Sequence, residues 1–507
     1  MPEGKILDLD KLAAVVSEAR ARGKVVVHCH GVFDLLHIGH IRYFEQARRM
    51  GDLLIVTLTP DHYVDKGPHR PAFTQDLRAE SIASLSCVDY VAINRWPTAE
   101  ETLRLLRPDL YVKGSEFKET SSDMTGKMGR EEKVVREIGA RLAFTEDVVF
   151  SSSNLINTHM SLFPVEVKEY LNLFKTRYSL NEVHEALNRL SKLKVLVIGD
   201  TIIDTYVYCE AIGKSSKDPV LALRHQSEDH FAGGVLAVAN HVANFAGHVE
   251  LFTVLGTVNT RQEFITSSLA SNVTPHFFLR PGAPTIVKQR FLEGYSLSKL
   301  LEIYYMDQSD IPDETIREVT AALKEKLKEC DVVVVADYGH GMMAKPIRRL
   351  LCEEAKFLAV NTQANAGNRG FNTITRYPRV DFGCIAEHEM RLETRDAEGE
   401  LRPMIEKLAP HLQSKVFVVT RGKKGALIWT GEGEFVIVPA FAMKVVDRVG
   451  AGDAFLSVTA LAAATGAPPE VLGFIGNVAG AQAVEIIGNQ KAIDKLKLQK
   501  TIVSMLK

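Results

Sequence analysis

Short apolar runs alternate with amphipathic helical patterns along most of the 507-residue chain, and this alternation restricts the possible folds more than any other feature. In the first third of the chain, the pattern predicts strands at 24–29, 53–59, 88–93, 110–112 and 141–146. Helices are predicted between them, near 38–50, 74–86, 98–106 and 130–138. Such alternation is typical of a parallel sheet with helices on both faces, which binds ligands at the carboxyl ends of its strands.

The alternation restarts near Lys194 and continues toward the end of the chain. It predicts strands at 194–198, 331–336, 357–361 and 415–419, and helices at 312–329, 344–355 and 451–465. Shorter strand-like pieces are predicted around 205–209 and 219–224. We therefore predict an α/β chain with two doubly wound parallel sheets, divided into a domain at 1–160, a helical connector at 161–192 and a domain at 193–507.

The composition argues against several classes of function. Lys and Arg number 61 against 63 Asp and Glu, a net charge of −2, so no surplus of positive charge favours nucleic acid or an anionic membrane. The six cysteines are scattered without a CxxC pair, which indicates reduced thiols in a cytoplasmic protein. The chain start does not resemble a signal peptide, and the most apolar helix, 454–467, is too short to insert into a membrane.

The stretch from Lys24 to Met50 combines a buried strand, a loop with Gly31 and the start of a helix. His37 and His40 flank Gly39 where that helix should begin. A helix N-terminus presents unpaired N–H groups and partial positive charge, which suits a phosphate. Imidazoles there can donate hydrogen bonds to phosphate oxygens, and a glycine lets a flat nucleotide base lie close to the backbone.

The ten residues Gly31-Val-Phe33-Asp34-Leu-Leu-His37-Ile-Gly39-His40 resemble the HxGH signature of the nucleotidyltransferase superfamily. The spelling is most similar to the cytidylyltransferases and to the adenylyltransferase half of the bacterial heptose-activating enzyme. The resemblance implies that Gly31, Phe33, Asp34 and Gly39 bind the nucleotide and that His37 and His40 are catalytic. The same letters also spell the HIGH motif of class I aminoacyl-tRNA synthetases, but the chain has no KMSKS-like loop.

Three further patches follow later strands of the same half, in the order expected for the heptose-type adenylyltransferase. They are the loop with Lys66 and Arg70, the strand end with Lys113, and the hydroxyl-rich helix start Ser151-Ser152-Ser153. Over roughly 24–157, the resemblance implies that the three cations face phosphates or the sugar phosphate, with Lys66 catalytic, and that the serines close the nucleotide site. Phe-Ser-Ser-Ser stands here where the family usually reads Ile-Ser-Thr-Thr, which keeps the hydroxyl groups.

The second half has its own phosphate-type motif, Asp447-Arg-Val-Gly450-Ala451-Gly452-Asp453, just before a helix. Two glycines at that place leave backbone N–H groups available for a phosphoryl group. Asp453 falls in the first helical turn, where a carboxylate can accept the proton of an attacking hydroxyl. A glycine-rich turn with an aspartate is also an ordinary way to begin a helix, so the motif needs support from the rest of the half.

That support comes from a resemblance to the ribokinase (PfkB-type) sugar kinases over about 194–490. The GAGD segment implies that Asp453 is the base and that Gly450, Ala451 and Gly452 form the anion hole. The order of the other matching segments implies ATP contacts at Thr420, Arg421, Gly422 and Gly425, and sugar contacts at Asp204, Gly233 and Gly234. The family also implies a small β lid from 205–224 and 285–306, which often forms a dimer.

Three departures from the kinase family concern the sugar and metal sites. Ala237 stands where the heptose kinases have an asparagine that contacts sugar. The Asn-x-x-Glu element reads Cys384-Ile-Ala-Glu387, so Glu387, which could contact Mg²⁺ through water, is kept and the asparagine is lost. Asn361-Thr-Gln-Ala-Asn365 replaces an Asp-Pro-Lys segment common among relatives. We therefore expect kinase activity on a substrate that need not be the familiar heptose phosphate.

Together these features predict a bifunctional, homodimeric sugar-activating enzyme. The C-terminal half would phosphorylate a sugar or sugar phosphate with ATP and Mg²⁺. The N-terminal half would transfer a nucleotidyl group from CTP or ATP to a sugar phosphate, yielding precursors of surface polysaccharide or lipopolysaccharide. The heptose-activating enzyme usually carries its kinase first, whereas this chain has the reverse order. An alternative is that one domain is catalytically silent and regulatory, which only Ala237 and Cys384 support.

Overall fold

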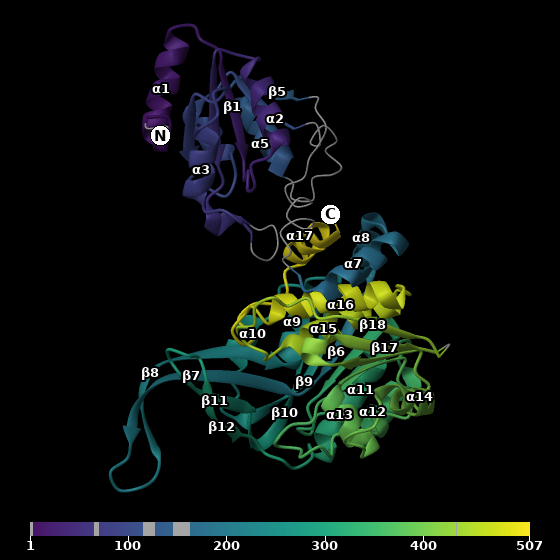
Figure 1. Ribbon diagram of the computed structural model, residues 1–507. Helices are drawn as coiled ribbons and strands as arrows, with labels where there is room; N and C mark the ends of the chain where they lie inside the picture. The colour runs from purple at the N-terminus through teal and green to yellow at the C-terminus, as the bar shows by residue number, and fades with distance from the viewer. Residues whose placement is uncertain (1–3, 65–69, 115–126, 146–162, 432, 507) are drawn as a thin grey trace. The chain divides into compact units, whose positions relative to one another are not determined.

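The computed structural model describes residues 4–64, 70–114, 127–145, 163–431 and 433–506 (Figure 1). The chain divides into two compact units, one formed by Met1–Pro164 with Gln499–Lys507 and the other by Val165–Leu498. None of the helices in the described part of the chain has both the length and the apolar character needed to cross a bilayer.

The first unit is built on a five-stranded parallel sheet in the order β3-β2-β1-β4-β5. The strands are β1 (Val26–Gly31), β2 (Leu53–Leu58), β3 (Tyr90–Ile93), β4 (Leu110–Lys113) and β5 (Arg141–Phe144). The helices are α1 (Leu9–Ala21), α2 (Ile38–Arg48), α3 (Gln75–Ala83), α4 (Glu100–Leu106) and α5 (Lys127–Glu137). Val27 of β1 packs with Phe44 of α2, and the adjacent Val26 packs with Val16 of α1. Because successive strand residues face opposite sides, both faces of the sheet are buried, as predicted.

The second unit begins with α7 (Val165–Arg177) and α8 (Leu180–Arg189), the helices predicted as a connector. Phe174 of α7 stacks on Phe474 with ring centroids 4.5 Å apart, and the ring centroids of Tyr170 and Phe441 lie 5.9 Å apart. These aromatic contacts make α7 part of the second unit's core. The limits 1–160, 161–192 and 193–507 remain predictions.

A nine-stranded sheet forms the centre of this unit, in the order β10-β9-β6-β13-β14-β15-β16-β17-β18. Its strands are β6 (Lys194–Gly199), β9 (His248–Val258), β10 (Val273–Pro284), β13 (Val332–Asp337), β14 (Leu358–Thr362), β15 (Phe382–Ala386), β16 (Val416–Thr420), β17 (Ala426–Thr430) and β18 (Phe435–Val438). The pairs up to β16 are parallel, but β17 and β18 are antiparallel. The sheet is thus parallel over most of its width, as predicted, and the two antiparallel strands lie at one edge, where the short turn Arg421–Gly425 reverses the chain.

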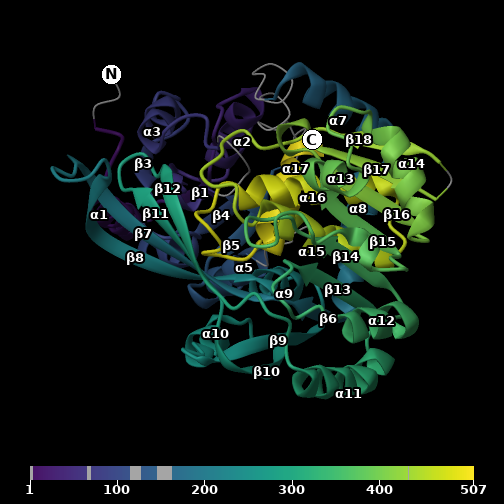
Figure 2. The ribbon, with the colours of Figure 1, turned by 90° about the horizontal axis from the view of Figure 1, so that it is seen from below.

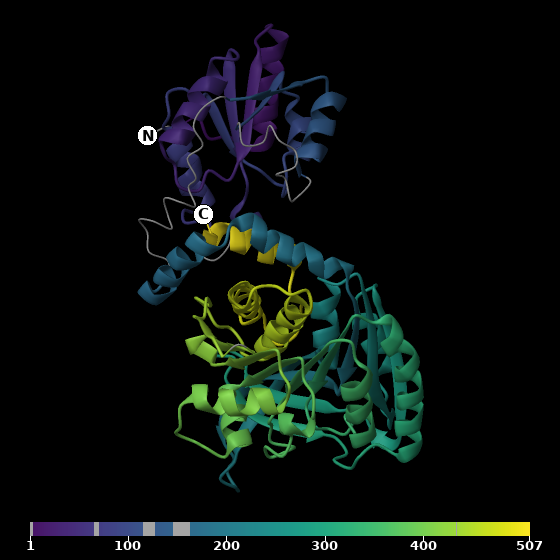
Figure 3. The ribbon, with the colours of Figure 1, turned by 90° about the vertical axis from the view of Figure 1, so that its right-hand side faces the viewer.

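Helices cover both faces of the nine-stranded sheet (Figures 2 and 3). One layer contains α11 (Asp313–Glu329), α12 (Lys345–Glu354), α13 (Glu387–Thr394) and α14 (Leu401–His411). The other contains α9 (Val235–Ala243), α15 (Ala451–Ala464) and α16 (Pro469–Ala483). A further helix of this unit is α10 (Gln262–Ser268), and α17 (Lys495–Leu506) begins in this unit and continues into the first unit at Gln499. The arrangement agrees with a doubly wound fold and places the carboxyl ends of β6, β13 and β14 at one edge.

A separate four-stranded sheet forms the predicted lid, in the order β12-β11-β7-β8. Its strands are β7 (Thr201–Lys214), β8 (Leu221–Gly234), β11 (Val287–Glu293) and β12 (Lys299–Tyr305). The β7–β8 hairpin is much longer than the short pieces predicted at 205–209 and 219–224 (Figure 1). Residues 224–230 of β8 are exposed, so this part of the strand carries no alternating apolar pattern that the sequence could reveal.

Candidate active sites

The first candidate site lies at the start of α15. Gly450 is the N-cap of this helix and has a φ of +82°, and a Cβ there would lie 2.2 Å from Oδ1 of Asn489. Only glycine suits both conditions. Ala451, Gly452 and Asp453 then form the first turn, whose backbone N–H groups have no partners within the helix. The four residues predicted as anion hole and base thus lie together at a helix N-terminus.

Asp453 has the properties of a base poised near neutral pH. Burial raises the pKa of this carboxyl to about 6, against the opposing effect of a hydrogen bond from Tyr338. The Tyr338 hydroxyl donates to Oδ1 of Asp453 at 2.7 Å. The Lys288 ammonium lies 5.9 Å from the centre of the Tyr338 ring and also lowers the pKa of Asp453. A carboxylate with such a pKa is largely ionised at pH 7 and can still take a proton.

The predicted sugar-binding residues meet beside this helix. Asp204 is buried, and Gly233 packs so closely against it that a Cβ would lie 2.1 Å from Oδ2. Gly234 is the N-cap of α9, with a φ of +58°. Arg290 of the lid forms an ion pair with Asp204. Asn489 donates to the same carboxylate at 3.4 Å and also borders Gly450, so it touches both the sugar side and the phosphoryl side.

Tyr338, Lys288, Arg290 and Asn489 were not among the residues predicted from the sequence. Tyr338 directly follows the apolar run of β13, and the sequence there carries no sign that its side chain reaches Asp453. Lys288 and Arg290 alternate on β11, and two cations on a strand expected to form the lid are the signal that could have revealed them. Asn489 has no comparable signal, because its partners are remote in the chain.

The predicted ATP loop forms the turn between β16 and β17. Thr420 ends β16, and the N–H of Arg421 donates to the carbonyl of Gly425 at 2.7 Å, with Gly422 inside the turn. Glu387 faces this turn, with Oε2 3.8 Å from Nε of Arg421, and Oε1 accepts a hydrogen bond from Arg391. The Arg391 guanidinium lowers the pKa of Glu387, so this carboxylate stays ionised.

Two of the positions at which the sequence departs from the kinase family, Cys384 and Ala237, are described by the structure. The buried Cys384 offers its carbonyl to Nδ2 of Asn361 at 2.7 Å, so a side-chain amide still lies beside this strand end. Ala237 is buried within α9. Within the described ranges, no group of three His, Cys, Asp or Glu side chains could hold a metal ion.

The second candidate site lies at the start of α2 in the first unit. His37 is the N-cap residue, and its Nδ1 accepts a hydrogen bond from the N–H of Gly39 at 3.1 Å. The His37 and His40 rings stack with centroids 3.9 Å apart, and Phe33 meets His40 edge to face at 5.4 Å. A Cβ on Gly31 would lie 2.9 Å from the Phe33 ring. Burial lowers the pKa of His37, so its imidazole is neutral at pH 7.

The charged residues predicted for this site are held by internal partners. Asp34 accepts from the N–H groups of Ala72 and Phe73 at 2.6 and 3.2 Å and forms a buried ion pair with Arg70 at 3.3 Å. Lys113, at the end of β4, pairs with Glu131 at 2.8 Å. Lys66 and Ser151, Ser152 and Ser153 lie outside the described residues, so their predicted roles stay predictions.

Arg78 is a further residue of this site that the sequence did not reveal. Its fully buried guanidinium donates to the carbonyls of Val32, Thr59 and Phe73 and pairs with Asp61 at 2.6 Å. These partners lie in the loops after β1 and β2 and in the segment before α3. Because a buried charge must be well paired, Arg78 fixes these three loops around the start of α2.

Comparison with known families gives one match in each half of the chain. A family model described as pfkB family carbohydrate kinase matches residues 192–496, more than half of the chain. A second model, described as cytidylyltransferase-like, matches residues 28–158. The cytidylyltransferase-like region therefore precedes the kinase-type region, the order inferred from the motifs.

Two curated relatives share the name Bifunctional protein HldE. The protein from Syntrophotalea carbinolica is 42% identical over 127 residues, which are 25% of this chain and 26% of the relative. The protein from Geobacter sulfurreducens is 36% identical over 170 residues, 32% of this chain and 33% of the relative. The chain thus spans about a quarter to a third of the length of these relatives.

Among solved structures, phosphofructokinase-2 from Escherichia coli in complex with potassium has a TM-score of 0.51 at 16% identity, covering 62% of this chain and 100% of the other. The same enzyme in complex with substrates and products has a TM-score of 0.50 at 17% identity over the same shares. At such low identity these similarities concern the fold alone, and they agree with the α/β architecture described above.

Proposed function

Because the chain belongs to the pfkB family of carbohydrate kinases, we propose that residues 193–507 transfer the γ-phosphoryl group of ATP to a hydroxyl of a sugar or sugar phosphate. The observation that carries this proposal is the start of α15, where Gly450 with its positive φ precedes a carboxylate whose pKa is raised to about 6. That combination offers N–H donors for a phosphoryl group and a base beside them.

In the proposed kinase reaction, Asp204 orients the acceptor through its hydroxyl groups, and Asp453 takes the proton of the hydroxyl that attacks. The N–H groups of Gly450, Ala451 and Gly452 stabilise the charge on the phosphoryl oxygens. The residues around Thr420 and Gly425 contact ATP. Mg²⁺ would neutralise charge on the ATP phosphates, with Glu387 reaching it through water because Arg391 already engages this carboxylate.

For residues 1–160 we propose nucleotidyl transfer from CTP or ATP to a sugar phosphate, with release of pyrophosphate. The stacked His37 and His40 at the start of α2 support this reaction. The phosphate oxygen of the acceptor attacks the α-phosphate in line, and the histidines donate hydrogen bonds to oxygens that gain charge. Lys66, Arg70 and Lys113 would add positive charge, and Ser151, Ser152 and Ser153 would close over the nucleotide.

The two proposed reactions fit one sequence of steps. Phosphorylation creates the phosphate group that nucleotidyl transfer requires as its nucleophile. The name of the curated relatives, Bifunctional protein HldE, supports two activities in one chain. We propose that the product is a nucleotide-activated sugar for surface polysaccharide or lipopolysaccharide, made in the cytoplasm where the nucleotides are available.

We also propose a homodimer that forms through the lid. Strand β12 exposes Leu301, Ile303 and Tyr305 at 46%, 39% and 50% of their surfaces. Alternate residues of a strand lie on one face, so these three side chains make an apolar row that a second lid could cover. Light scattering on the purified chain should give twice the monomer mass, and Leu301→Glu with Ile303→Glu should give the monomer mass. An unchanged mass in this variant would exclude the lid as the interface.

Two screens test the proposed activities. The first measures ADP release with ATP–Mg²⁺ and a panel of sugars and sugar phosphates, with Asp453→Asn as the inactive control. The second measures pyrophosphate release with each of the four nucleoside triphosphates and the same sugar phosphates, with His40→Ala as its control. Release of ADP that Asp453→Asn does not reduce would refute the kinase assignment. Pyrophosphate release that survives His40→Ala would refute the assignment of the other site.

A further inference from the structure

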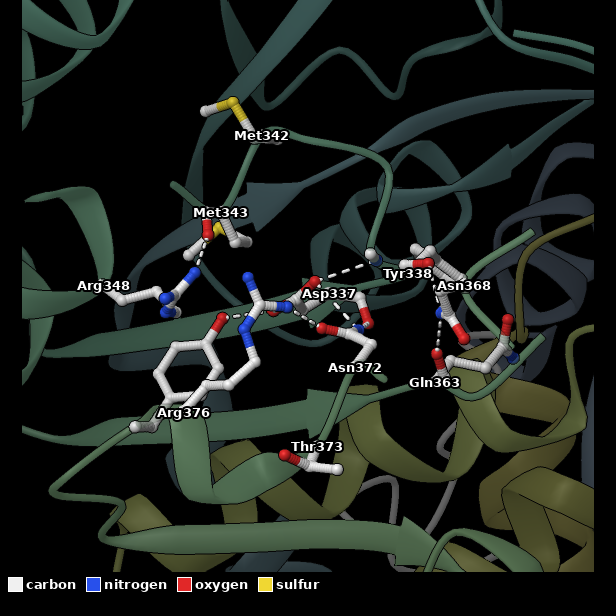
Figure 4. Close-up of polar contacts among 12 residues, drawn as sticks. Asp337, Tyr338, Met342, Met343, Arg348, Gln363, Asn368, Asn372, Thr373 and Arg376 are labelled. Carbon is white, nitrogen blue, oxygen red and sulfur yellow. Dashed lines mark hydrogen bonds and ion pairs between the residues drawn. The ribbon is translucent and has the colours of Figure 1, made fainter. Parts of the chain in front are cut away.

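Tyr338, directly after β13, is held at three points. Its N–H donates to Oδ2 of Asp200 at 3.0 Å, and its hydroxyl donates to Oδ1 of Asp453 at 2.7 Å. Its carbonyl accepts two hydrogen bonds, from Nδ2 of Asn365 at 2.8 Å and from Nδ2 of Asn368 at 3.0 Å. The amide of Asn368 points at Tyr338 in Figure 4. The side chain is 3% exposed, so backbone and ring are both fixed.

The two asparagines are themselves fixed by reciprocal bonds within the loop after β14. Oδ1 of Asn365 accepts from the N–H groups of Gly367 and Asn368 at 3.0 and 3.2 Å. Oδ1 of Asn368 accepts from the N–H groups of Asn365 and Gly370, both at 3.1 Å. Each side chain thus closes its own turn while its amide nitrogen reaches Tyr338. This is the loop that stands in place of the Asp-Pro-Lys segment of relatives.

Asp200 fixes the other side of Tyr338. Besides the N–H of Tyr338, its carboxylate accepts from the N–H groups of His340 and Met342 at 3.2 and 3.1 Å. Asp200 follows β6 directly, so the turn after β13 is tied to the end of the neighbouring strand β6. Burial raises the pKa of the Tyr338 hydroxyl well above its ordinary value, so this group keeps its proton and acts as a donor.

We infer that Tyr338 is a positioning residue for Asp453, and that Asn365 and Asn368 act on this base through Tyr338. The inference rests on the proposed kinase function. The tyrosine hydroxyl donates its hydrogen bond to Oδ1 of Asp453, and no other side chain in the described structure donates to this carboxylate. Oδ2 of Asp453 is therefore left for the acceptor hydroxyl. A donor on a carboxylate favours its ionised form, so the same bond opposes the effect of burial and keeps the base ionised near neutral pH.

The test is the pH dependence of kcat/KM for ADP formation by the full chain carrying Tyr338→Phe. The acidic limb of the profile is the fall in kcat/KM as the pH is lowered. Loss of a hydrogen bond to a charged group should move this limb to higher pH by about one unit. Activity should therefore fall by about fivefold at pH 6 and recover at pH 8.5, where the base is ionised again. An acidic limb that stays at its original pH would overturn the inference.

Tyr377→Phe is the matched control. The Tyr377 hydroxyl donates to Oδ2 of Asp337 at 2.7 Å, so this variant loses an equally short bond from a buried tyrosine to a buried aspartate next to Tyr338. The acidic limb of this variant should stay where it is in the parent protein. An equal shift in both variants would mean that any repacking of this region moves the limb, and would refute a specific role for Tyr338.

The role of the asparagines is tested by Asn365→Ala with Asn368→Ala, alone and combined with Tyr338→Phe. Alone, the pair should lower kcat by about tenfold and move the acidic limb in the same direction as Tyr338→Phe. Because residues that act through one another are not additive, the combined variant should lose little more than Tyr338→Phe. Independent, multiplying losses would show that the asparagines act by another route.

A measurement without catalysis separates this inference from the proposed function. The folded pKa of Asp453 is raised, so the ionised carboxyl destabilises the fold increasingly as the pH rises through that pKa. Asp453→Asn should therefore raise the free energy of unfolding more at pH 8 than at pH 5. The margin, which is the gain at pH 8 minus the gain at pH 5, should be larger in the Tyr338→Phe background than in the parent protein. An equal margin would overturn the inference. Absence of ADP formation with every acceptor would instead refute the kinase proposal.

Discussion

The two candidate sites both use the N-terminus of a helix, but they place different chemistry there. At α2 the first turn carries His37 and His40, and the pKa of His37 is lowered by burial. At α15 it carries Asp453, whose pKa burial raises to about 6. The proposed reactions explain the difference. A neutral hydroxyl must lose its proton as it attacks, whereas a sugar phosphate is already an anion and needs only stabilisation of the charge that develops.

The distinction between the two sites is tested most strongly by variants that should each lose one activity and keep the other. Asp453→Asn should lower ADP formation by about 1,000-fold, because a general base is removed, and leave pyrophosphate release unchanged. His40→Ala should do the reverse, with a loss of about 100-fold or more in pyrophosphate release. Steady-state assays of both products on each purified variant decide the matter. A variant that loses both activities would contradict the assignment of two independent sites.

His37→Asn separates the capping role of that residue from its chemical role. Asparagine is a favourable N-cap, so the free energy of unfolding should change by no more than about 0.5 kcal/mol. Pyrophosphate release should still fall by about 100-fold, because the imidazole donor is lost. Denaturant unfolding and the pyrophosphate assay on the same preparation provide both readings. Retained activity would mean that His37 only caps the helix.

Gly450→Ala should reduce ADP formation by about 30-fold and destabilise the second unit by about 1–2 kcal/mol, since alanine must adopt a positive φ and displace Asn489. Gly452→Ala is the matched comparison in the same turn, where an added Cβ meets no atom within 4 Å. Its losses should be clearly smaller in both ADP assays and thermal unfolding. Equal losses would indicate that the turn tolerates no side chain for reasons other than backbone geometry.

The pH profiles should differ between the two reactions. Asp453 must be ionised to accept a proton, so kcat/KM for ADP formation should be lost as the pH falls through about 6, by about tenfold for each further unit. Pyrophosphate release has no such base, so its acidic limb should not follow this pKa. Parallel assays from pH 5 to 8 on one preparation provide the comparison. Coinciding limbs would remove the distinction between the sites.

The sequence predicted the fold through its alternation of strands and helices, and located both helix starts through local motifs. It could not reveal contacts that the fold creates between distant segments, such as Tyr338 with Asp453 or Asn489 with Asp204. The sequence also led to an underestimate of the length of the β7–β8 hairpin, because an exposed strand has no regular alternation of apolar and polar residues. Propensity and periodicity are local properties, whereas a site depends on which loops a sheet brings to one edge.

Asn489 has a consequence for how this protein could change over time. One amide touches both the carboxylate expected to select the acceptor and the glycine expected to frame the phosphoryl group. Substitutions that reshape Asp204 for a new sugar would shift Asn489 and with it Gly450. Laboratory evolution toward new acceptors should therefore alter turnover at the same time, and recovery of speed should require a compensating change at or beside position 489.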